Sequence, residues 1–439
     1  MPQPKAQTNP PLGRPTRAIR NDARNILRCV ATLLLLIFSA SIGHSVDGQA
    51  PGNNAPARAD SGPAREAWRL QVEPLAVIGS GRPGVLAADI DKPDGIEFTP
   101  SGLLLITDAG NRRVQVWDVR SATRLGEFGR GHFGGEITNI AIAPNGTVYV
   151  ADSDLNLVYA FAPPEPSDNR RFNYKFLGTR FGEQGFRKLG GMAIDSRGRI
   201  YIADGNLWEV RRFTPDCKPD PTWRFERTLS DGDTVLHRCE GMAIDEQRGL
   251  LYVASEADSV IKVFDLETGA FKRSLIGAKP DREGRPAGVR IFNGSVEGLA
   301  IINGHLLAVD EEIGHIHVWD MSRPDFLDAD LPAYAAARQN GASAYKGFFG
   351  RSPRVNFDVD DTPNPDLDLK RRVEEGAVIP GIVNPPGHFC SPDEVAAYVD
   401  TAGGEAYVAV ADQCNFRVVV YRWSEIQKAI AARSRSSSR

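Results

Sequence analysis

One pattern recurs six times between Asp94 and Arg422 and constrains the fold more than any other feature. Each copy holds an alternating run, a turn that often contains Gly, an apolar run that ends near Asp, and a second alternating run. These periodicities predict three short strands per copy. The copies span residues 94–118, 138–162, 190–214, 240–265, 297–320 and 393–422.

A fourth strand is expected after the first five copies, at residues 123–129, 171–178, 222–229, 271–277 and 344–350. Four strands per unit, repeated every roughly 40 to 50 residues, are typical of a β-propeller blade, because one such sheet cannot cover its own faces. The sixth copy lacks this run, and residues 68–79 supply it from before the first copy. We therefore expect an all-β fold, a six-bladed β-propeller over residues 67–423, closed by an N-terminal strand.

Two further segments belong to this expectation. Residues 424–439 are predicted to form a short C-terminal helix and a tail, with Ser424 and Gln427 as a capping box. An insertion at residues 321–390 separates the fifth and sixth copies and includes an expected short helix at Leu331–Arg338. Its last part, Ile379–Cys390, immediately precedes the sixth copy, so we expect it to cover part of the channel mouth.

The N-terminus carries an export signal. Residues 1–28 hold six basic residues and one acid, and an apolar stretch from Cys29 to Ile42 is followed by small residues. This predicts a signal peptide over residues 1–45, with an uncleaved signal anchor as the alternative. Residues 46–66, rich in Pro, Gly, Ala and Asn, are expected to be a disordered linker. We expect an exported protein, periplasmic or extracellular, with no membrane insertion beyond this segment.

Charge narrows the class of partner. Without residues 1–45 the chain carries 46 basic and 55 acidic residues, a net charge of −9. An acidic surface argues against nucleic acid as a partner. A protein or a small molecule remains as the expected ligand of a monomeric propeller.

Four cysteines follow the signal segment: Cys217, Cys239, Cys390 and Cys414. In an exported protein an even number of cysteines indicates disulfides, and sequence alone permits three pairings. Strand direction places Cys390 and Cys414 on the same face of their blade, so this pair is the predicted disulfide. The other two are left as possible free thiols.

The copies resemble a known repeat. Thr107-Asp108 followed by Gly110-Asn111-Arg112-Arg113-Val114, and Ala411-Asp412 followed by Cys414-Asn415-Phe416-Arg417-Val418, are similar to the NHL repeat. The resemblance covers nearly all of residues 68–422 and implies a propeller, whereas NHL-type propellers include peptide and RNA binders as well as lyases. Function is therefore not fixed by it.

Copies four and five resemble a different group. Glu240-Gly241 with Ser255-Glu256, and Glu297-Gly298 with Asp310-Glu311-Glu312, look like blades of β-propeller phytases and related esterase-like propellers. The other acidic signatures of the phytases are not evident. Asn139 could also match the metal-binding Asn of the senescence-marker and gluconolactonase propellers, although the acids here come in a different order.

Acids begin several inner strands and should converge on one mouth of the central channel. Carboxylates brought together in this way repel one another unless a cation or a proton relieves them. Oxygen donors without nearby cysteine or a histidine triad favour Ca²⁺ over zinc. The predicted metal ligands are Asp94, Asn139, Glu240, Glu297 and Glu394. The alternative is that these acids only satisfy backbone N–H groups in turns. His315 and His317, which alternate on one strand, are interpreted as a polar outer face rather than as ligands.

Two functions stay open. The first is an exported binding or scaffold propeller. The second is a calcium-dependent hydrolase or lyase, phytase-like or lactonase-like, with its site in the channel mouth. The sequence contains no Gly-rich phosphate loop, nucleophile elbow or HExxH motif, which argues against a serine nucleophile.

Overall fold

The structure is a computed structural model of the 439-residue chain. It describes residues 68–165, 168–169, 172–181, 185–228, 234–275, 292, 295–323, 326, 344–350 and 385–436. The predicted signal segment, the linker and most of the insertion, including the expected helix at 331–338 and the start of the expected mouth cover, lie outside these residues. No helix in the described part of the chain is long and apolar enough to cross a lipid bilayer.

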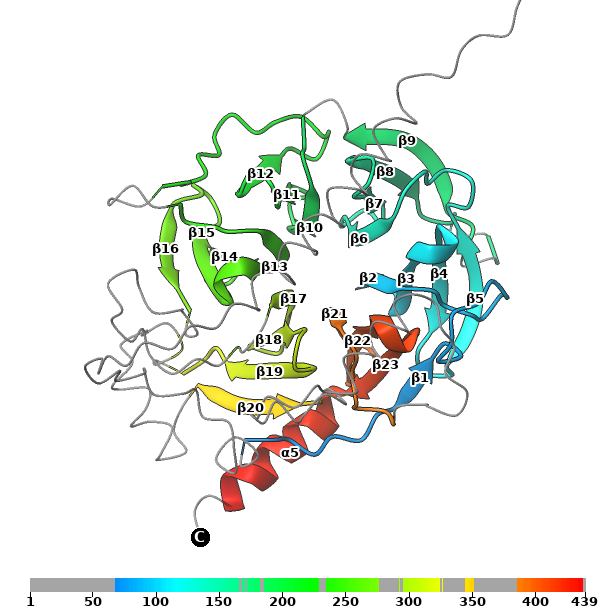
Figure 1. Ribbon diagram of the computed structural model, residues 1–439, viewed down its shortest axis with the longest axis vertical. Coiled ribbons are helices and arrows are strands. Elements are labelled where there is room, and N and C mark those ends of the chain that lie inside the picture. Colours follow the sequence, from blue (N-terminus) through cyan, green and yellow to red (C-terminus); the bar gives the residue numbers. More distant parts are fainter. Residues whose placement is uncertain are drawn as a thin grey trace, which may run out of the picture. The chain divides into compact units, whose positions relative to one another are not determined.

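Six antiparallel sheets surround a central channel, each with its first strand nearest the axis (Figure 1). The predicted six-bladed β-propeller is thereby confirmed. The inner strands of blades one to six are β2 (Pro93–Phe98), β6 (Ile137–Ile142), β10 (Leu189–Ile194), β13 (Cys239–Asp245), β17 (Val296–Ile302) and β21 (Pro392–Val399).

The remaining strands follow outward in chain order. The second strands are β3 (Leu103–Asp108), β7 (Val148–Asp152), β11 (Ile200–Asp204), β14 (Leu250–Ser255), β18 (His305–Asp310) and β22 (Ala406–Asp412). The third strands are β4 (Arg113–Asp118), β8 (Leu157–Ala162), β12 (Glu209–Phe213), β15 (Val260–Asp265), β19 (His315–Asp320) and β23 (Arg417–Arg422). The fourth strands are β5 (Thr123–Phe128), β9 (Lys175–Phe181), β16 (Phe271–Ser274) and β20 (Tyr345–Phe349).

Glycine makes the turn between the first two strands of a blade. Gly102 has φ +77° and Gly146 has φ +83°, a region that side chains with a Cβ rarely adopt. Each donates its N–H to the carbonyl oxygen three residues earlier, Thr99 and Ala143, at 2.8 Å. These are the hairpin turns that the sequence predicts.

A buried Asp ends the second strand in five of the six blades. Its role is structural: Asp108 Oδ2 accepts from Arg113 Nε at 2.6 Å, and Asp412 Oδ2 accepts from Arg417 Nε at 2.7 Å. Asp152 and Asp204 accept backbone N–H groups of nearby loops instead. The Asp and Arg of the NHL-like runs therefore tie loops to strands. The five residues, all fully buried, are Asp108, Asp152, Asp204, Asp310 and Asp412.

The N-terminal segment closes the ring, as predicted. Strand β1 (Ala76–Ile78) pairs antiparallel with β23 and places Val77 opposite Val419. Upstream, the N–H of Leu70 donates to the carbonyl oxygen of Phe348 in blade five at 2.7 Å. The segment thus joins two neighbouring blades, which the sequence did not indicate.

Blade three departs from the prediction. The strand expected at 222–229 is not formed, and β12 is the outermost strand of that sheet among the described residues. The N–H groups of Arg224 and Glu226 donate to blade four instead, to Thr268 O and Gly269 O, each at 3.0 Å. Pro219 and Pro221 precede this run, and proline cannot donate to a ladder, which separates it from β12.

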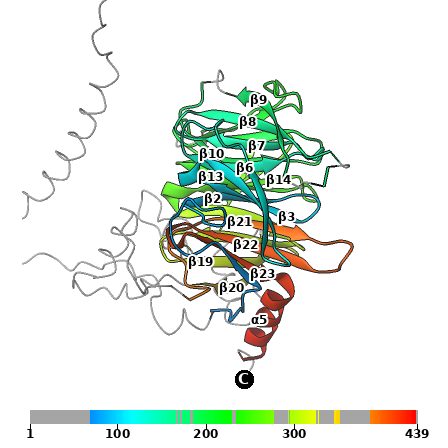
Figure 2. The same cartoon turned by 90° about the vertical axis from the view of Figure 1, so that its right-hand side faces the viewer.

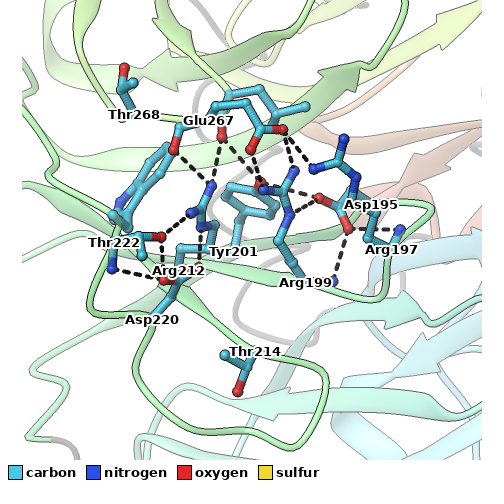
Figure 3. A network of polar contacts seen from close by, with 12 residues as sticks. Asp195, Arg197, Arg199, Tyr201, Arg212, Thr214, Asp220, Thr222, Glu267 and Thr268 are labelled. Atoms are coloured by element: carbon cyan, nitrogen blue, oxygen red, sulfur yellow. Dashed lines mark hydrogen bonds and ion pairs between the residues drawn. The ribbon is translucent and has the colours of Figure 1, made fainter.

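Two arginines of blade three take the place of the missing strand, and the buried one, Arg212, holds this loop (Figure 3). Arg212 donates to Asp220 Oδ2 at 2.8 Å, to Thr222 Oγ1 at 3.0 Å and to the Leu266 carbonyl oxygen of blade four at 2.9 Å. Arg199 forms a two-pronged pair with Glu267 of blade four, at 2.7 and 2.9 Å. The two blades are therefore joined by polar side chains where the other sheets have a fourth strand.

The C-terminal helix α5 (Trp423–Ser436) lies along the outer edge of the ring (Figures 1 and 2). Trp423 and Ile426 pack into the apolar cluster shared by blades five and six. The predicted capping box is wrong. Strand β23 runs directly into the helix, so Ser424 is already helical and its Oγ lies 3.2 Å from Glu405 Oε2.

Candidate functional site

Four carboxylates from four blades reach the same mouth of the channel: Asp94, Glu240, Glu297 and Asp393. Each directly follows the first residue of its inner strand, where the pairing register with the second strand shifts by one residue. A β-bulge of this kind bends the strand and re-aims a side chain. The repeat therefore places four acids at one depth, three of which the sequence singled out.

Glycine follows three of these acids because neighbouring inner strands touch at that depth. A Cβ on Gly241 would lie 2.4 Å from the carbonyl oxygen of Glu297, and one on Gly95 would lie 2.7 Å from the Cα of Asn139. Neither distance is compatible with a side chain. The glycine packs the blades together, and the acid before it is left to face the channel.

The acids enclose a cavity of about 230 Å³, lined by all five predicted residues. Two basic side chains, Lys188 and Arg238, stand among them. The acids that line the cavity are Asp94, Glu240, Glu256, Glu297, Glu311, Asp393 and Glu394.

Asn139 and Glu394 lie one residue further along their inner strands than the position of Asp94, where blade one has Gly95. Register pairs Asn139 with Ala151, and Thr138 takes the position of Asp94. The Asn139 amide nitrogen lies 3.4 Å from Glu394 Oε2, and its oxygen accepts the N–H of Met192 at 2.9 Å. Asn139 therefore bridges three blades with an oxygen that is already hydrogen-bonded.

Asp94 and Asp393 form a hydrogen-bonded carboxyl pair. Burial and the adjacent Asp393 charge raise the pKa of Asp94 well above its usual range. Burial also raises the pKa of Asp393, and the hydrogen bond from Asp94 partly offsets that rise. Like charges this close cannot both ionise easily, so Asp94 carries the shared proton.

Glu240 and Glu297 differ in their partners. Lys188 Nζ lies 3.1 Å from Glu240 Oε1, and this cation partly offsets the burial that raises the pKa of Glu240. Burial and the neighbouring acids, Glu240 first, raise the pKa of Glu297 well above its usual range. Protonation therefore neutralises part of the negative charge that a bound cation would otherwise balance.

Sequence reasoning missed several residues of the cavity. Lys188 immediately precedes an inner strand, so its position one residue before the repeat was an available signal. Glu256 and Glu311 belong to the phytase-like motifs of copies four and five but were not predicted as site residues; they follow second strands and reach the cavity from outside the inner ring. Arg238 pairs with Glu256 at 2.7 Å and keeps that acid at the mouth.

The carboxylates are not arranged as a preformed metal site. Within the part of the chain that the structure describes, no three His, Cys, Asp or Glu side chains have the mutual spacing of metal ligands. The oxygen-rich donor set still suits Ca²⁺ by its chemistry. Binding would require Asp94 to release its proton and the side chains to turn toward a common centre.

Cys390 and Cys414 lie together on the mouth side of blade six. The N–H of Cys414 donates to the carbonyl oxygen of Cys390 at 3.1 Å. Their predicted disulfide stays a prediction. Cys217 and Cys239 carry free thiols in different places, with Cys239 Sγ donating to the Asp204 carbonyl oxygen at 3.3 Å and Cys217 Sγ lying 3.7 Å from Tyr149 Oη.

The interpretation of His315 and His317 as an outer face is wrong. Their exposed fractions are 5% and 1%. His317 Nδ1 lies 2.8 Å from Tyr345 Oη, and the His315 ring stacks on Phe348. The third strand of blade five is covered by β20, which buries both rings.

The comparisons with known proteins concern the fold alone. No protein-family model matches this chain, and no curated protein sequence matches it either. A solved Bacteroides thetaiotaomicron protein of unknown function is similar at 15% identity and a TM-score of 0.50, over 80% of this chain and 75% of that one.

Two solved structures of sugar dehydrogenases, one of them putative, are also similar. A putative glucose dehydrogenase from Thermus thermophilus has 14% identity and a TM-score of 0.46, over 80% of this chain and 99% of that one. The PQQ-bound aldose sugar dehydrogenase of Streptomyces coelicolor has 14% identity and a TM-score of 0.44, over 81% and 99%. At such identities the likeness concerns the fold alone, and the NHL resemblance stays a prediction.

Proposed function

We propose that this protein is an exported, monomeric binding propeller whose ligand site is the acidic channel mouth, and that the site holds Ca²⁺. One observation carries the proposal: Asp94, Glu240, Glu297 and Asp393 come from four blades and share one depth of one cavity. Burial without enough opposite charge leaves the pKa of each carboxyl raised. A divalent cation would relieve that repulsion.

Calcium titration tests this proposal. Ca²⁺ added to the EDTA-treated protein should raise the melting temperature. At a hundredfold excess of Ca²⁺ over the dissociation constant, the free energy of unfolding should increase by about 2.7 kcal/mol. Because Ca²⁺ competes with protons at these carboxyls, the shift should be larger at pH 8 than at pH 5.

Matched variants separate the site from general ion effects. Glu240→Gln and Glu297→Gln should each reduce the calcium-dependent shift, whereas the exposed-loop variant Asp216→Asn should leave it unchanged. A wild-type protein whose melting temperature does not respond to calcium would remove the cation from the proposal and leave a scaffold.

The Asp94–Asp393 pair favours a second candidate, a calcium-dependent hydrolase or lyase. In this candidate Glu240 and Glu297 would hold the cation without Asp94, so that the protonated carboxyl of the pair and its ionised neighbour supply the acid and the base that such reactions need. Lys188, at 3.1 Å from Glu240, adds a cation that can face a substrate oxyanion.

A substrate screen distinguishes this candidate from the binding module. Phosphate esters and lactones should be turned over in the presence of calcium, and Asp94→Asn or Asp393→Asn should lower kcat by at least about 100-fold, the lower range of general acid–base contributions. If calcium binds and no ester or lactone reacts, the binding module is preferred.

A further inference from the structure

A second cavity lies at the opposite end of the channel. Its volume is about 400 Å³, and inner-strand residues of all six blades line it. Aliphatic side chains such as Ile142, Ile194 and Met242 contribute to its wall, with the hydroxyl-bearing Thr99 and Tyr398 near its rim. Its size falls within the usual range for small-molecule sites.

Glu97 breaks the repeat in this cavity. It is the second residue after the bulge in blade one, paired with Leu105. Because five blades place a methyl group at this point, the fold does not require a carboxylate there. The residues in the same register position of the other blades are Ala141, Ala193, Ala243, Ala300 and Ala396.

The charge of Glu97 is not balanced by the protein. Its Oε1 accepts the N–H of Phe98 at 2.9 Å, and no Lys, Arg or His is among the described residues that line the cavity. Asp195, the other lining acid, is held by Arg199 Nε at 2.6 Å. The charge of Glu97 also acts on another acid of the channel, Glu394, whose pKa it helps to raise. Burial raises the pKa of Glu97 to about 7.

We propose that this cavity binds a small organic amine, whose ammonium group pairs with the Glu97 carboxylate and whose apolar body contacts the aliphatic wall. An opposite charge at one point stabilises an ionised buried carboxylate most directly. A metal ion fits less well, because Ca²⁺ takes six to eight oxygen ligands and Glu97 is the one lining carboxylate not already paired. The site is separate from the acidic mouth and does not depend on calcium.

Calorimetric titration with benzylamine, and with the neutral benzyl alcohol, tests the proposal. At pH 8 the wild-type protein should bind the amine at least tenfold more tightly than the alcohol. Glu97→Gln should remove that preference, while the exposed-acid control Asp216→Asn should retain it. Binding of the amine should weaken at pH 5, because that pH lies below the pKa of about 7 of Glu97, and burial also raises the pKa of the neighbouring Glu394.

Folding of the variants is checked independently. Glu97→Ala makes blade one like the other five, so its circular dichroism should match that of the wild type and its melting should remain cooperative. The proposal is overturned if folded wild-type protein shows no binding of benzylamine at millimolar concentration, or binds amine and alcohol equally. Equal amine affinity in the Glu97→Gln variant would also overturn it. Calcium titration of the same samples reports separately on the acidic mouth.

Discussion

At the scale of single residues, the acid and the glycine that follows it in an inner strand have different roles. The glycine after the acid allows neighbouring blades to touch, because a Cβ on Gly241 would lie only 2.4 Å from the carbonyl oxygen of Glu297. The acid before it lines the channel mouth, where burial disfavours its charged form. Natural proteins keep such residues where function demands them, at a cost in stability. Glu97 is the clearest case, because the other blades show what its position needs for folding alone.

This cost can be measured through pH. The pKa of Glu97 is raised from 4.5 to about 7 in the folded protein, so the unfolded chain ionises first and stability falls as pH rises between those values. Glu97→Ala should therefore match the wild type near pH 4 and exceed its unfolding free energy at pH 8. The gain is at most about 3 kcal/mol, less as channel water screens the charge. Urea unfolding of both proteins at each pH checks it, and a pH-independent difference would contradict it.

The sequence was most informative where the repeat was regular. Asp94, Glu240 and Glu297 could be predicted because each follows the same strand start. Asn139 and Glu394 were assigned to that same depth for their side-chain chemistry, although each is the second residue of its copy. The pairing register confirms that both lie one step further along the strand.

At the scale of elements, alternation alone does not make a strand. Residues 222–229 alternate as a strand would, yet two prolines precede them, and Arg212 of β12 binds the side chains of Asp220 and Thr222 at the start of the run. Arg212 also stacks on Trp223, 4.8 Å from the ring centroid. Long-range side-chain bonds of this kind have no local signature. The predicted helix cap was wrong for a related reason. Ser424 is a residue type that often caps a helix, but the sequence does not show that the helix begins at Trp423, directly after β23.

At the scale of the whole molecule, closure of the ring was predictable. The sequence shows that the sixth copy lacks a fourth strand, and that an extra strand precedes the first copy. The structure adds that the closing segment is longer than its strand. Trp68, Leu70 and Ile78 are all at least nine-tenths buried, with exposed fractions of 9%, 2% and 1%. Arg433 of the C-terminal helix lies 3.9 Å from the centroid of the Trp68 ring. The closing segment and the C-terminal helix therefore meet at the junction of blades five and six.

Truncation at two points tests this closure. Removal of residues 1–67 should leave the melting temperature almost unchanged, because the closing segment and its contacts remain. Removal of residues 1–79 should destabilise the propeller by several kcal/mol, since each fully buried large apolar side chain contributes about 1.5–3 kcal/mol. It also exposes the edge of β23, which should favour association between molecules. Thermal melting and size-exclusion chromatography of the two truncations measure both effects. Equal stability and a monomeric profile for the shorter chain would show that the ring closes without its N-terminal strand.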